Sequence, residues 1–184
     1  MRRSLIDAYS RLLRERPIAT NTAQGATLAA LGDVTAQWLE GRSGDAKRTL
    51  RAGCIGAGFA GFVYPPVYAR LDALWPGTLW PAVLRKSLTE CALLGTFGNG
   101  TSLLLRGLPP SDVLASMPNV LLNEARVWLP YNLVAFSLVP RHIRPTTTSC
   151  LTVGWHTYIS WLANDAPRPG AGALQAGAPS ISSR

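Results

Sequence analysis

Side chains that could do chemistry are few in this sequence of 184 residues, and they lie among long uncharged runs. Candidates for a polar path or pore are the residues inside or beside apolar stretches: Asp33, Gln37, Glu90, Asn132, Arg126 and Arg141. An ionised side chain at the centre of a bilayer costs roughly 2.5–3.5 kcal/mol on insertion scales, so it faces a bundle interior, a water-filled path or an opposite charge. Asp33 has two alternative interpretations: a structural ion pair, or a position at the membrane interface.

The composition favours a membrane protein. Asp, Glu, Lys and Arg make up 15% of the chain, against about 25% in a typical soluble domain, and 47% is hydrophobic. This balance excludes a disordered chain and a coiled coil. The net charge of +8 comes from basic residues in loops and at span ends, which is typical of a topology signal. We therefore expect a lipid bilayer as partner and no nucleic acid.

Blocks poor in charge define the elements that position the candidate residues. They cover residues 17–39, 52–69, 91–105, 127–140 and 145–164. About 17–25 mostly apolar residues can cross a bilayer. The first two blocks are long enough to cross a bilayer. The third block reaches that length if residues 86–90 form its first turn, and the fourth reaches it if the flanking arginine side chains extend to the membrane interfaces. The fifth, rich in Thr and Ser, predicts a last helix at the interface or inside the bundle.

The predicted fold class is all-α, a polytopic membrane bundle of four spans with helical segments at both ends. Residues 1–16 form an amphipathic N-terminal arm, with Leu5, Tyr9 and Leu13 on one stripe. This arm predicts a membrane-surface helix, a targeting segment or an ordinary solvated helix. Residues 17–164 form the bundle, and 165–184 a disordered tail of low complexity. Loops are expected at 40–51 and 71–81, and Ser111 is expected to cap a short helix that ends near Arg126.

Small residues predict close helix packing. Residues 56–61 match GxGxxG, but they lack the preceding strand and the later acid of a dinucleotide site. Gly53, Ala57 and Gly61 instead recur every four residues as one ridge, and Gly25 and Ala29 have the same spacing on the first span. We expect Trp38, Trp128 and Trp161 to anchor span ends at the membrane interface.

Enzyme signatures are absent from the sequence. It contains no phosphate-loop, HExxH or GxSxG motif. Cys54, Cys91 and Cys150 are too far apart for a metal or redox motif and are expected to be buried free thiols. The two histidines are isolated. We therefore expect no enzyme, no metal and no cofactor.

Weak motifs follow one another along most of the chain. They consist of Tyr9, Leu13 and Pro17; Gly32, Asp33 and Gln37; Arg48 and Arg51; Tyr68, Leu71, Asp72, Pro76 and Gly77; Lys86 and Glu90; Trp128, Phe136, Val139, Pro140 and Arg144; and Trp155, Tyr158, Ser160 and Trp161. Their order and spacing from Tyr9 to Trp161 resemble the Mpv-seventeen / peroxisomal-membrane-protein-twenty-two family of small four-span proteins of mitochondrial inner and peroxisomal membranes. Cys91 stands where the family has Gln, Ala135 where it has Asn, and His156 where it has Asn. These departures put family-specific pore chemistry in doubt.

The resemblance implies a multi-pass organelle protein that acts as a pore or pore component for small solutes, or as a membrane-homeostasis factor. Its expected location is the mitochondrial inner membrane in preference to the peroxisome, and a homo-oligomer is one route to a conduit. The alternative is a non-transporting scaffold that assembles partners through its glycine-rich helix faces. A soluble helical binding domain is a third alternative, because the mean hydropathy is only +0.13.

Overall fold

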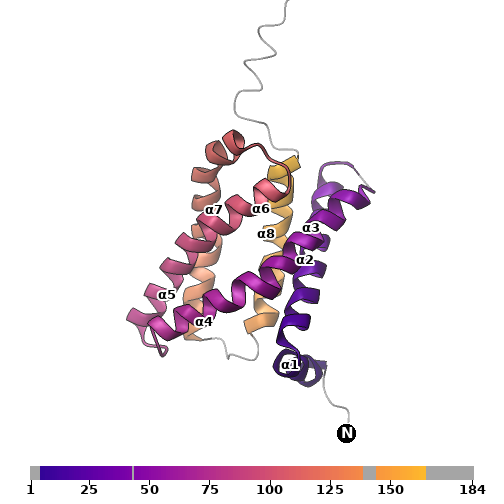
Figure 1. Ribbon diagram of the computed structural model, residues 1–184. Helices are drawn as coiled ribbons and strands as arrows, with labels where there is room; N and C mark the ends of the chain where they lie inside the picture. Colours follow the sequence, from indigo (N-terminus) through magenta and orange to yellow (C-terminus); the bar gives the residue numbers. More distant parts are fainter. Residues whose placement is uncertain (1–4, 43, 139–143, 165–184) are drawn as a thin grey trace, which may run out of the picture.

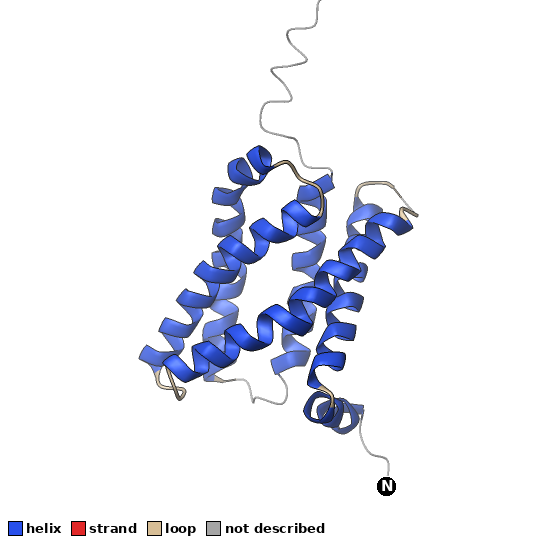
Figure 2. Cartoon of the chain, viewed as in Figure 1, coloured by secondary structure: helices blue, strands red, loops and turns tan. Residues whose placement is uncertain are grey.

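The regular structure of the described residues consists of helices alone (Figure 2). A computed structural model describes residues 5–42, 44–138 and 144–164. Its elements are α1 (Leu5–Glu15), α2 (Pro17–Leu39), α3 (Ala46–Gly58), η1 (Phe59–Val63), α4 (Tyr64–Leu74), α5 (Trp80–Leu93), η2 (Leu94–Gly98), α6 (Asn99–Leu105), α7 (Pro110–Ser137) and α8 (Arg144–Asn164). The predicted all-α class is confirmed.

Two long helical rods each contain a π-helical turn. α3, η1 and α4 follow one another without a break, and so do α5, η2 and α6. In Figure 1 the first rod runs obliquely in front of the other helices, and the second returns beside it toward the top of the view. A π turn inserts one extra residue into a helix and is frequent at functional sites. The two π turns therefore make the middle of each rod a candidate functional region.

The predicted blocks largely coincide with helices. The first block agrees with α2 at both ends, the second and third lie within the two rods, and the fifth lies within α8. The connections are shorter than expected, because α3 begins at Ala46 and α4 continues to Leu74. In the part of the chain that the structure describes, no single helix has both the length and the apolar character needed to cross a membrane. The tail 165–184 lies outside the described residues.

The prediction of a separate short helix that ends near Arg126 is wrong. α7 runs for 28 residues and includes both Pro118 and Pro130. It begins at Pro110 without a side-chain cap, because proline at the first helical position has no N–H that needs a partner. The charges inside α7 are tolerated because Glu124 is buried with a hydrogen-bond partner whereas Arg126 is exposed.

The contact between α2 and α3 requires glycine on both helices. A Cβ on Gly25 or on Gly56 would overlap the backbone carbonyl oxygen of the other residue. Gly53 and Gly61 also face α2, whereas Ala57 is only half-buried. Gly56 therefore makes the close approach that the predicted ridge assigned to Ala57. The ridge cannot keep its four-residue spacing to Gly61, since Gly61 lies in the π turn η1.

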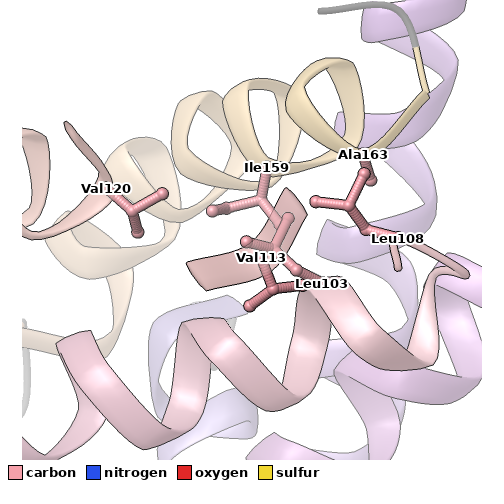
Figure 3. Packing of buried hydrophobic residues seen from close by; sticks show 6 residues of the cluster. All are labelled: Leu103, Leu108, Val113, Val120, Ile159 and Ala163. Carbon is pink, nitrogen blue, oxygen red and sulfur yellow. The ribbon is translucent and has the colours of Figure 1, made fainter. Parts of the chain in front are cut away.

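α8 lies against α2 and also closes the apolar core. Gly32 permits the contact with α2, because a Cβ there would lie 2.5 Å from Cβ of His156. On its other side α8 packs with α6, α7 and the connection between them. Figure 3 shows this cluster, which consists of Leu103, Leu108, Val113, Val120, Ile159 and Ala163.

Candidate functional site

Buried charges gather around Asp33 at the end of α2. The Asp33 cluster consists of Asp33, Gln37, Glu40, Arg48, Thr49 and Ser160. The Asp33 side chain is fully buried. Its Oδ1 accepts hydrogen bonds from Arg48 Nε at 2.8 Å and from Ser160 Oγ. Its Oδ2 accepts from Gln37 Nε2 and Thr49 Oγ1, each at 2.8 Å. Because the four lone-pair sites of this carboxylate are occupied, no site remains for a solute.

Arg48 links Asp33 to a second carboxylate. Its Nη1 and Nη2 donate to the two oxygens of Glu40 at 2.6 and 2.7 Å, which is a bidentate pair. Nη2 also donates to Ser160 Oγ at 3.3 Å. The Asp33 cluster therefore ties α2, α3 and α8 together.

The short connection between α2 and α3 brings Arg48 to Asp33. Gly41 ends α2 with φ of 68°, a left-handed conformation that favours glycine. The N–H of Arg42 then donates to the carbonyl of Gln37 at 2.9 Å, as in a Schellman motif. Asp45 caps α3, because its Oδ1 accepts from the backbone N–H of Arg48 at 2.9 Å. These two caps define the turn that places Arg48 over the last turns of α2.

A cavity of about 460 Å³ lies in the middle of the bundle. Every helical element of the described chain except α1 contributes to its wall. This volume is in the range of small-molecule sites, which is about 300–1,000 Å³. Its polar lining includes Tyr68, Glu90, Asn99, Glu124, Asn132 and Trp155.

Glu90 is held from two sides at this cavity. Tyr68 Oη donates to Glu90 Oε1 at 2.9 Å, and Asn132 Nδ2 donates to Glu90 Oε2 at 2.7 Å. Only 4% of Glu90 is exposed. The three residues come from α4, α5 and α7, so one carboxylate orients a side chain from each of two other helices.

Glu124 is the second buried carboxylate of the wall. Asn99 Nδ2 donates to Glu124 Oε2 at 2.9 Å, and Asn99 Oδ1 accepts from Trp155 Nε1 at 3.1 Å. The chain can approach Glu124 closely at Gly95, where a Cβ would lie 3.0 Å from Cγ of Glu124. Gly95 belongs to the π turn η2, so the second rod is adapted to this carboxylate.

A polar layer separates the cavity from a second, smaller one. Ser102 and His156 line the large cavity, and Arg106 and Ser160 follow one turn later on their helices. Arg106 Nη1 donates to Ser160 Oγ at 3.1 Å, so Ser160 joins Arg106 to the Asp33 cluster. Beyond this layer lies the vestibule, a cavity of about 170 Å³ lined by Asp45, Lys47, Arg48, Arg51, Arg106 and Asn164.

The predicted polar-path residues separate into different places. Glu90 and Asn132 meet at the large cavity. Asp33 and Gln37 lie in the Asp33 cluster, where Asp33 has the ion-pair arrangement that was one of its alternative interpretations. Arg126 is exposed on α7 and lines neither cavity. Arg141 lies outside the described residues.

Two expectations about single side chains need correction. Trp128 was expected at a span end, but it lines the large cavity and packs edge-on against Trp155 with 6.3 Å between ring centroids. The reason is that α7 begins at Pro110, so Trp128 lies well inside the helix. Cys54 was expected to be buried but is exposed, because its neighbours Gly53 and Ile55 take the buried positions of α3. Trp38 and Trp161 are exposed, by 75% and 38%.

Sequence reasoning did not select Tyr68, Asn99, Glu124 and Arg106 as site residues. Glu124 did carry a signal, since an acid within an apolar helix needs a buried partner. That partner, Asn99, is 25 residues away on another helix, and no local spacing indicates such a pair.

Known proteins resemble this chain over most of its length. The model of the Mpv17 / PMP22 family matches residues 109–160. The mitochondrial inner membrane protein Mpv17 of Bos taurus is 35% identical over 172 residues, and that of Homo sapiens is 32% identical over 169 residues. Each alignment covers 85% of this chain and 96% of the relative. Protein SYM1 of Gibberella zeae is 29% identical over 181 residues, covering 86% of this chain and 97% of the relative. No solved structure matches.

Proposed function

Because the chain belongs to the Mpv17 / PMP22 family and is a protein of the mitochondrial inner membrane, we propose that it forms a weakly selective pore, or part of one, for small polar solutes. In this proposal it is a multi-pass protein of the bilayer and has no catalytic activity. A role in membrane homeostasis would follow from such permeability.

The large cavity is the observation that carries this proposal. A volume of about 460 Å³ has room for roughly fifteen water molecules at about 30 Å³ each. Helix bundles normally fill their cores with side chains at high density. Here glycines and π turns shape the wall, and the buried polar groups along it hold one another in place. The wall is thus mainly apolar with a few preorganised polar groups, a combination that suits the passage or binding of a small molecule with polar groups of its own.

The charge of the wall favours cations and neutral solutes. The carboxylates of Glu90 and Glu124 line the cavity, together with Asp72, whose charge is compensated by Lys86 at 2.6 Å; the lining includes no lysine or arginine among the described residues. Acidic rings favour cations in channels. Glu90, a predicted polar-path residue, lines the cavity and would contribute to this preference, whereas Asp33 does not line the cavity.

A conduit would have to open at the polar layer or arise between subunits. Arg106 and Ser160 lie one turn beyond the cavity residues Ser102 and His156, and Ser160 joins Arg106 to Asp33. Opening therefore requires either that these bonds separate or that a homo-oligomer supplies a path beside them. The proposal includes both routes.

Reconstitution into liposomes tests the proposal, with a matched pair of substitutions on α6. Ser102 lines the cavity, and its neighbour Thr101 is exposed. Ser102→Phe should reduce the flux of small polar solutes several-fold because the ring fills part of the cavity. Thr101→Phe should leave the flux close to that of the wild type. Equal flux through both variants would refute a path through the cavity.

The scaffold alternative lacks the surface on which it depended. Gly25, Gly53, Gly56 and Gly61 pack between α2 and α3 of this chain, so their faces are already covered. A soluble helical domain disagrees with the location in the mitochondrial inner membrane.

A further inference from the structure

Arg106 is buried with half of its guanidinium unused. Only 4% of the residue is exposed. Nη1 donates to Ser160, but within the described residues Nε and Nη2 have no hydrogen-bond partner. These two nitrogens form one edge of the planar group, the edge that binds two oxygens of a carboxylate or phosphate side by side. The unpartnered atoms are therefore a complete bidentate donor.

An unpaired edge of this kind is costly. Buried charged groups in proteins are normally paired and hydrogen-bonded, because leaving a buried donor unsatisfied loses the whole hydration of that donor. Asp33 does not relieve the edge, because its Oδ1 faces Ser160 and Arg48. Other atoms of Arg106 line the vestibule, whereas Nε and Nη2 have almost no accessible surface, so an oxyanion in this cavity reaches the edge only after a small movement of the side chains that cover it.

Two further basic side chains stand at the vestibule. Arg51 is exposed, and its Nη1 donates to the backbone carbonyl of Arg106 at 3.0 Å. Lys47 is exposed and also lines the cavity. Asp45 is the carboxylate in the lining, and it is occupied as the cap of α3. Arg48 is neutralised by Asp33 and Glu40. The charges nearest the cavity therefore have a positive excess.

The C-terminal end of α6, which carries Arg106, is held by backbone hydrogen bonds and apolar packing. Gly107 follows with φ of 96°, and the N–H of Leu108 donates to the carbonyl of Leu103 at 3.1 Å, which completes a Schellman motif. Leu103 and Leu108 both belong to the apolar cluster. The backbone at Arg106 is therefore fixed before any ligand arrives, and the bond from Nη1 to Ser160 restricts the side chain, which lowers the entropic cost of binding.

We propose that the vestibule binds an oxyanion of the phosphate class, held side-on by Nε and Nη2 of Arg106, with Arg51 and Lys47 at the entrance. Its volume of about 170 Å³ equals roughly five to six water molecules, which accommodates one such group with water around it. The group comes either from a soluble phosphate compound or from a phospholipid headgroup. This site stands apart from the proposed pore, because binding is measured without any flux.

The test measures thermal unfolding of the purified full chain in detergent during titration with inorganic phosphate. Potassium chloride at matched ionic strength controls for screening. We expect a saturable rise of the midpoint with phosphate alone. Arg106→Gln should raise the half-saturating concentration about tenfold or more, because a bidentate charged contact is lost. Arg106→Lys should not restore binding, since a single ammonium cannot replace the fork.

Arg51→Gln keeps the test decisive if the Arg106 variants do not fold, because Arg51 is exposed. It should weaken phosphate binding several-fold, whereas Arg85→Gln, which removes an exposed charge from the other end of the second rod, should not change it. Equal effects of phosphate and chloride, or equal loss in Arg51→Gln and Arg85→Gln, would overturn the proposal.

Two further arms identify the source of the anion. Asp165 follows Asn164 in the sequence and lies outside the described residues. Phosphate binding that appears only in Asp165→Asn would overturn the proposal, because the chain itself would then supply the carboxylate.

Nanodiscs of phosphatidylcholine with or without phosphatidylglycerol separate the external sources. Loss of phosphate binding in the presence of phosphatidylglycerol assigns the site to a headgroup, and unchanged binding assigns it to soluble phosphate. Either of these two results supports the proposal.

Discussion

A single methyl group at Gly56 tests the α2–α3 crossing on which the polar layer depends. In Gly56→Ala the new Cβ would overlap the carbonyl oxygen of Gly25 and lie 3.0 Å from its carbonyl carbon, where ordinary contact begins at 3.4 Å. Both obstructing atoms belong to the backbone and cannot rotate away. Gly58→Ala, two residues later in α3, would meet nothing within 4 Å and is the matched control.

The magnitude follows from two opposing effects. Replacing glycine by alanine inside a helix stabilises it by about 1 kcal/mol, and both variants gain this amount. Overpacking costs about 1–3 kcal/mol, and only Gly56→Ala incurs it. The two variants should therefore differ by about 1–3 kcal/mol, which corresponds to a difference in melting temperature of about 2–12 °C for a chain of this size.

Relaxation of the crossing would add to this cost. If α3 moves away from α2 by about 0.5–1 Å, the 2.8 Å bond between Arg48 and Asp33 lengthens toward the limit at which hydrogen bonds weaken steeply. Thermal unfolding in detergent, followed by far-UV circular dichroism, measures the difference. A Gly56→Ala variant as stable as Gly58→Ala would refute the close crossing of the two helices.

Two other substitutions address the cluster and the core in the same assay. Asp33→Asn should lower the free energy of unfolding by about 3–5 kcal/mol, since it removes one partner of a buried ion pair and turns an amide NH₂ toward donors. Glu15→Gln, at an exposed residue of α1, is the control. An equally small effect of both substitutions would contradict the burial of Asp33. Leu103→Ala should cost about 2–5 kcal/mol because Leu103 is fully buried, whereas Leu104→Ala, at a residue that is 46% exposed, should cost less than about 1 kcal/mol. Similar losses in the two leucine variants would show that the apolar cluster is not packed as in Figure 3.

Charge placement predicts much of the fold. The uncharged run 17–39 agrees with α2 because a buried helix excludes charge and Pro17 stands at its first position. The mitochondrial inner membrane location, expected from the resemblance to the family, is confirmed by the relatives. The continuity of α7 could not be read from charge, because Glu124 and Arg126 lie on different sides of one helix.

The candidate site is less predictable, since its contacts join residues far apart in the chain. Glu90 and Asn132 are polar residues in apolar runs, and this property selects them. Nothing local indicates that Tyr68 reaches Glu90, since the position of Tyr68 depends on the π turn that precedes it in the first rod. Hydropathy has no signature for a π turn, so the register beyond η1 and η2 is visible only in the structure.

The bond between Ser160 and Asp33 joins residues 127 positions apart and gives the last helix a particular part in folding. α2 and α3 can pair early, because they are adjacent in sequence and local contacts form fastest. The contacts of Asp33 and Arg48 with Ser160 form only after α8 has folded onto α2, which requires nearly the whole chain. A chain that stops before Ser160 would contain α1 to α7 and still leave Asp33 and Arg106 without their shared partner. The last helix therefore completes the buried polar contacts of α2 and of the end of α6.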